Sequence, residues 1–158
     1  MKKQLLLAGL SLVLSTATFA QKKNVTDAIL LMRKYNPTGD IAANKKTVTE
    51  AKNFIDLAAA NAETAEDLKM HLYRGEIYYC LNEVNEIENK GLLSDVSTTN
   101  EWKATAVASF KKVLDDPKKT YTADAQNFIN GRVDFMFNQG IIAYNAKKYV
   151  DAANAFMA

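Results

Sequence analysis

Two residues of the chain have the spacing of catalytic groups. Ser109 and Lys112 form a Ser-x-x-Lys element, which serine acyl-transferring enzymes use because one helical turn brings the amine to the hydroxyl. The companion Ser-Asp-Asn and Lys-Thr-Gly elements are missing from the sequence. Lysine-rich helices produce this spacing by chance, so we expect no catalysis from the pair.

The sequence has one histidine, His71, and one cysteine, Cys80. A Ser/His or Cys/His arrangement would have to use the histidine, but a packed or partly exposed histidine and a small buried thiol explain both residues better. One histidine and one cysteine also fall short of the usual zinc ligand set, and a single cysteine forms no internal disulfide.

Carboxylates and glycines give no further site. Asp115 and Asp116 precede a proline at a predicted helix end, and Glu83, Glu86 and Glu88 belong to a polar stretch typical of a solvated face. The glycines are isolated, with no phosphate-binding loop. The sequence therefore predicts no enzyme, no metal site and no cofactor.

Residues 1–20 differ from the rest of the chain. Lys2 and Lys3 precede an apolar run over residues 5–14, and Thr18 and Ala20 stand at the −3 and −1 positions of a small-residue cleavage site. This pattern predicts a signal peptide, with the mature chain beginning near Gln21 and no membrane span after cleavage. We therefore expect an exported protein, periplasmic or associated with the outer membrane.

Composition agrees with one folded domain over residues 21–158. The 158 residues include 48% hydrophobic and 24% charged residues and only 2 prolines, and a chain of this length buries a sizeable core. Without Lys2 and Lys3, the 20 basic residues fall to 18, equal to the 18 acidic ones. A net charge of zero with interleaved signs argues against nucleic-acid binding.

Apolar residues recur with helical spacing along the mature chain, which predicts an all-α fold. The first helix is expected at about 25–35, capped by Asn24 or Thr26 and ended by the turn at 36–39. A capping-box spacing at 47–50 predicts the start of a helix that ends near Asn61.

Three longer helical patterns follow. Thr64 is expected to cap a helix from 65 to about 87, whose broad apolar face predicts packing on two sides. Residues 82–100 read as an extension of this helix followed by a loop. Helices are then expected at 102–114, from Thr122 to about Tyr144, and from Tyr149 onward.

The segment from Gly140 to Phe156 resembles a tetratricopeptide repeat. Small, aromatic, alanine and aromatic residues stand there at the family spacing, and an earlier segment matches in part. Together these residues are expected to pack the repeats: Gly75, Tyr78, Ala106, Phe110, Gly140, Tyr149, Ala152 and Phe156. The family period is about 34 residues, so the longer interval between Gly75 and Gly140 requires two insertions, placed at predicted loops or helix extensions.

The resemblance implies antiparallel helix hairpins stacked as a short right-handed α-solenoid. It also implies a concave groove for a protein or peptide, lined by Lys69, Leu72, Glu76, Tyr79, Asp134, Phe137, Ile141 and Tyr144. The alternative for several of these side chains is the core. Because the apolar face is incomplete at Phe156, we expect either further repeats beyond Ala158 or a partner that covers it.

The sequence therefore predicts a bacterial, extracytoplasmic scaffold that binds a protein of the cell envelope. Two alternatives stay open. One is a helical-repeat accessory protein for glycan binding and uptake, and the other is the N-terminal part of a longer envelope protein whose function lies elsewhere.

Overall fold

The computed structural model describes residues 22–88, 96–150 and 152–153, and of residues 96–100, 135, 136 and 139 it describes the backbone alone. Within these ranges the regular structure is helical throughout and includes no strand, which confirms the all-α prediction. The predicted signal peptide and Phe156 lie outside the described residues.

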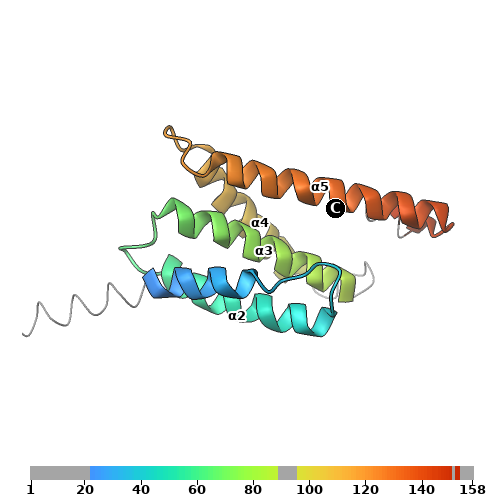
Figure 1. Ribbon diagram of the computed structural model, residues 1–158, viewed down its shortest axis with the longest axis horizontal. Coiled ribbons are helices and arrows are strands. Elements are labelled where there is room, and N and C mark those ends of the chain that lie inside the picture. The colour runs from blue at the N-terminus through green and yellow to red at the C-terminus, as the bar shows by residue number, and fades with distance from the viewer. Residues whose placement is uncertain (1–21, 89–95, 151, 154–158) are drawn as a thin grey trace, which may run out of the picture.

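The helices follow one another along the chain as antiparallel neighbours (Figure 1). A first helix over residues 22–32 precedes four long ones, and a last helix begins at residue 149. The long helices are α2 (Ile41–Ala59), α3 (Leu68–Glu88), α4 (Val96–Leu114) and α5 (Thr122–Asn145). Within the described ranges, no helix combines the length and hydropathy needed to cross a bilayer.

α3 is the central helix of the fold. It lies between α2 and α4 and shares a long interface with each of them, whereas α5 contacts α3 and α4 over a much shorter length. Ile77 and Met70 of α3 are fully buried, as are Ile55 of α2 and Ala28 of the first helix. The broad apolar face of α3 is thus buried on two sides, as its sequence predicts.

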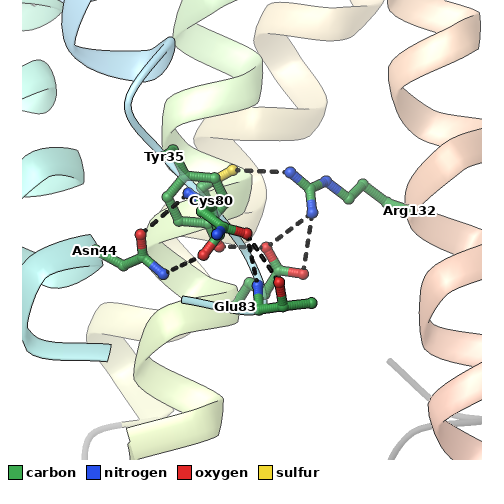
Figure 2. Close-up of polar contacts among 7 residues, drawn as sticks. Tyr35, Asn44, Cys80, Glu83 and Arg132 are labelled. Carbon is green, nitrogen blue, oxygen red and sulfur yellow. Dashed lines mark hydrogen bonds and ion pairs between the residues drawn. The ribbon is translucent and has the colours of Figure 1, made fainter. Parts of the chain in front are cut away.

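α2 begins earlier than the capping-box spacing predicts. The Oδ1 atom of Asp40 accepts a hydrogen bond from the Ala43 amide at 2.7 Å, which makes Asp40 the N-cap. The prediction of a helix start at residues 47–50 is therefore wrong. Close to this cap, buried Asn44 donates to the Asn36 carbonyl at 2.6 Å and accepts from the Asn36 amide at 3.2 Å, which fixes the turn between the first helix and α2 (Figure 2).

Two other predicted caps are also wrong. Thr64 does not begin α3: its buried hydroxyl donates backwards to the Ala58 carbonyl, at the end of α2. α3 begins at Leu68, after Asp67, whose Oδ1 atom accepts from the Lys69 amide at 2.8 Å. Residues 22–32 are helical, so Asn24 and Thr26 lie inside the first helix. The predicted helix end at Leu114 and helix start at Thr122 are confirmed.

Candidate functional site

The predicted repeat-packing residues of α3 and α4 meet in the core. Gly75 faces the ring of Phe110 so closely that a β-carbon on Gly75 would lie 2.8 Å from Cε1 of Phe110. Tyr78, Ala106 and Phe110 are buried. A residue without a β-carbon is therefore what allows the ring of α4 to rest on the backbone of α3.

Of the matching residues near the C-terminus, two are buried and one is exposed. Gly140 and Ala152 are buried. Tyr149 is 59% exposed, so it does not fill the gap between helices that the repeat pattern assigns to it. Its ring instead lies edge-on to that of Tyr144, with the centroids 5.7 Å apart.

The groove residues predicted on α3 do not share one open surface. Leu72 is buried among Phe110, Val113 and Ala125, and the Tyr79 ring packs edge-on against Phe128 at 5.7 Å. These two side chains belong to the interface with α4 and α5, which is the alternative that the sequence left open. Of the remaining two, Lys69 is exposed and Glu76 is partly buried.

The residues predicted on α5 are exposed. Val133, Phe137, Ile141 and Tyr144 are spaced by four, four and three residues, which places them on one side of a helix. We call them the α5 outer face; their exposed fractions are 62%, 57%, 39% and 59%. Asp134 is exposed beside them. Four large apolar side chains along one exposed helical face form a candidate binding surface.

A buried polar cluster joins three parts of the chain (Figure 2). Arg132 reaches across from α5, and its Nη1 atom lies 3.4 Å from both carboxylate oxygens of Glu83 on α3. The Tyr35 hydroxyl, just after the first helix, donates to Glu83 Oε2 at 2.6 Å. Arg132 Nη2 also contacts the sulfur of Cys80 at 3.8 Å. Tyr35, Cys80, Glu83 and Arg132 are called the Arg132 cluster below.

The electrostatic surroundings of the Arg132 cluster keep its thiol and its phenol protonated. Burial raises the pKa of the Cys80 thiol well above its usual range, so the thiol stays protonated and is a poor nucleophile. Burial and the neighbouring Cys80 and Glu83 likewise raise the pKa of Tyr35, which stays neutral and can donate to Glu83. Nucleophilic catalysis needs the opposite shift. The cluster is better suited to positioning helices than to chemistry.

Glu76 has surroundings that bring its pKa close to neutral pH. Desolvation by burial raises its pKa to about 7, with Arg132 lowering it and Asp124 raising it. Glu76 belongs to α3, and the two charges that act on its carboxyl group, Arg132 and Asp124, belong to α5. Protonation of Glu76 therefore couples this interface to pH.

A second polar cluster ties α2 to α3. Both carboxylate oxygens of Asp56 accept from the Tyr78 hydroxyl, at 2.8 and 2.9 Å, and Lys52 Nζ lies 2.7 Å from Oδ2. The Arg74 guanidinium lies 5.0 Å from the Tyr78 ring centroid, and Arg74 Nε lies 3.5 Å from Asp56 Oδ1. These contacts explain why Tyr78 occupies the packing position that the sequence identified.

The Ser-x-x-Lys pair has separate surroundings. Ser109 is buried, 2% exposed, whereas the Lys112 amine pairs with Glu66 at 3.0 Å on the surface. His71 is buried as well, and desolvation, followed by the charge of Lys112, lowers its pKa. The imidazole therefore stays neutral around pH 7, which fits a packed side chain.

Sequence reasoning did not find Arg132, Glu83, Tyr35 or Asp56 as partners. These contacts join residues 22 to 52 positions apart, and no local spacing indicates them. One available signal was the position of Arg132, four residues after Phe128 and therefore on the packed side of α5.

Among the described residues, no group of three or more His, Cys, Asp or Glu could hold a metal ion. No protein-family model matches the chain, and no curated protein or solved structure is similar enough to count as a match.

Proposed function

We propose that the chain is an exported scaffold of the tetratricopeptide type, which binds a protein or peptide of the cell envelope and catalyses no reaction. The observation that carries this proposal is the α5 outer face, an apolar stripe formed by Val133, Phe137, Ile141 and Tyr144. Exposure of such a stripe to water is unfavourable in free energy. Aromatic side chains such as those of Phe137 and Tyr144 are enriched at protein interfaces.

The stacking of α3 on α4 supports the repeat part of the proposal. Gly75 and Phe110 occupy small and aromatic positions of the tetratricopeptide pattern and are in direct contact. The solenoid geometry and the family remain part of the proposal. The export part rests on the cleavage pattern at residues 1–20.

The glycan-binding alternative receives less support. Trp102 is the single tryptophan of the chain, and it packs partly buried against the main core cluster. Sugar stacking needs an exposed aromatic platform, and Trp102 does not offer one. The exposed rings of Phe137 and Tyr144 belong to a stripe that also holds Val133 and Ile141, which suits an apolar protein surface better than a sugar. The described residues also favour no catalytic role, because the thiol of Cys80 and the imidazole of His71 are both buried.

The proposal is tested by affinity capture from solubilised cell envelope, using the chain from Gln21. The test variant is Phe137→Ala with Tyr144→Ala, on the α5 outer face. The control is Leu57→Ala with Val107→Ala, which removes two apolar side chains of similar exposure, 57% and 67%, from α2 and α4. Circular dichroism checks that both variants keep the parent helicity.

We expect the parent and the control to retain the same envelope protein and the test variant to lose it. Retention by all three forms would refute a role for the α5 outer face. Export is checked separately by the mass of the N-terminal peptide of the protein isolated from cells, which should begin at Gln21.

A further inference from the structure

α5 is attached to the rest of the protein through its first part. Ala125 is fully buried, and the Phe128 ring packs against Tyr79 and Phe110, with centroids 5.7 and 5.6 Å apart. Arg132 follows one turn later. The described side chains from Val133 to Asn138 are exposed, so the docked surface between α5 and α3 is short (Figure 1).

Of the contacts named here between α5 and α3, those of Arg132 lie furthest along α5. The Arg132 side chain is 16% exposed and that of Glu83 is 3% exposed. Its guanidinium also lies over the rings of Phe128 and Tyr35, at 5.1 and 5.6 Å from their centroids. For a buried ion pair, the loss of hydration offsets much of the attraction, but removal of one partner is strongly destabilising because the other charge is left buried and unpaired.

The remainder of the fold has its own core. Residues of the first helix, α2, α3 and α4 form the main buried cluster, to which α5 adds only the partly buried Phe128. The connection between α4 and α5 is held locally: Asp116 accepts hydrogen bonds from the amides of Lys118 and Thr120, at 3.2 and 2.9 Å. Most of the main cluster, including Ala28, Val48, Ile55 and Met70, belongs to helices other than α5, whereas its edge at Tyr79 and Cys80 lies against Phe128 and Arg132 of α5.

We propose that α5 is a releasable helix, which detaches from α3 as a unit while the first helix, α2, α3 and α4 stay folded, and that Arg132 holds the docked state. Release removes the guanidinium from the sulfur of Cys80 and uncovers the α3 surface around Tyr79, Cys80 and Glu83. Access to that surface is thereby controlled by the helix that carries the α5 outer face. Release of α5 requires no envelope partner, so this proposal can be tested independently of the proposed function.

Two readouts on the full chain test the proposal. Cys80 is the single cysteine, so the rate of its reaction with a chromogenic disulfide reports the uncovering of one known atom. Hydrogen exchange followed by mass spectrometry reports the opening of α5 and of α3 separately. Both are measured over a range of urea concentrations below the global unfolding transition, which circular dichroism defines.

In the parent, we expect both Cys80 labelling and exchange in α5 to depend on urea much less than global unfolding does, because release of one helix exposes little surface. Arg132→Met should accelerate both by about tenfold or more, because it leaves Glu83 buried without its cation. Exchange in α3 should stay slow. The control Arg33→Met makes the same substitution at an exposed arginine and should leave both rates unchanged.

Equal urea dependence of α5 exchange and of global unfolding in the parent would overturn the proposal, because α5 would then open only with the whole fold. This comparison needs no variant, so it tests the separate opening of α5 even if Arg132→Met fails to fold. Equal rates in Arg132→Met and Arg33→Met would refute the role of Arg132.

Discussion

Gly75 and Phe110 are in contact across the interface between α3 and α4, with no room for a β-carbon on the glycine. Such an atom would lie 2.8 Å from Cε1 and 2.9 Å from Cδ1 of the ring. Real β-carbons essentially never approach so closely. Either the ring or the helix must therefore move if any other residue replaces Gly75.

Gly75→Ala is expected to lower the free energy of unfolding by about 1–3 kcal/mol, the usual range for overpacking a core. This loss occurs although alanine favours a helix interior over glycine by about 1 kcal/mol. Urea unfolding followed by circular dichroism measures the change. Adding Phe110→Leu should restore part of the loss, because the smaller side chain makes room for the methyl group.

Gly131→Ala is the matched control for this prediction. Gly131 lies inside α5, and a β-carbon there would meet no atom within 4 Å. The substitution should raise the free energy of unfolding by about 0.5–1 kcal/mol through helix propensity alone. A gain of stability at both glycines would contradict the close packing of Gly75 on Phe110.

The start of α2 gives a second prediction. Asp40→Ala removes the side chain that caps the Ala43 amide, and it should cost about 1 kcal/mol of stability. Thr47→Ala changes the residue that the capping-box spacing identified, which lies inside the helix, and it should cost little. Thermal unfolding of the two variants measures the difference, and a larger loss from Thr47→Ala would instead favour a helix that begins at 47.

The contrast between Gly75 and Asp40 shows what the sequence can predict. The spacing of small and aromatic residues predicts that Gly75 and Phe110 lie on packed faces of neighbouring helices, so their contact was open to prediction. The N-cap at Asp40 is a local choice between two possible starts, and Ile41 is the one large apolar side chain among the helical residues 41–46, too little to show a helical period. The Arg132 cluster depends on how α5 crosses α3, which no local pattern specifies.

The partly buried Glu76 makes stability depend on pH. Its pKa is raised from 4.5 to about 7, so the folded state holds the proton more tightly than the unfolded state does. The corresponding stability is fully present below about pH 4.5 and is lost as the pH rises towards 7; its size is about 3 kcal/mol at most.

Glu76→Gln mimics the protonated form and should therefore be more stable than the parent at pH 8, with little difference at pH 4.5. Urea midpoints measured from pH 4.5 to 8 check this. Glu50→Gln, at an exposed position of α2, controls for the loss of one carboxylate. If Glu76→Gln were less stable than the parent at pH 8, the charge of Arg132 would stabilise the ionised carboxylate by more than its burial costs.

Two tyrosines donate to carboxylates across helices, and the burial of the acceptor should decide what each hydroxyl contributes. Tyr35 donates to Glu83, whose side chain is 3% exposed, and Tyr78 donates to Asp56, whose side chain is 31% exposed. In Tyr78→Phe, water can replace the lost hydroxyl at Asp56, and Lys52 remains 2.7 Å away. In Tyr35→Phe, Glu83 keeps, within the described part of the chain, the longer contact with Arg132 at 3.4 Å. We therefore expect Tyr78→Phe to cost about 1 kcal/mol of stability and Tyr35→Phe about 2 kcal/mol, because a buried acceptor left unsatisfied costs more than an accessible one.

Urea unfolding of the two single variants at one pH tests which substitution lowers the free energy of unfolding more. Equal losses of stability would mean that water reaches Glu83 as readily as it reaches Asp56. The Arg132 cluster would then not exclude water, contrary to what the burial of Glu83 indicates.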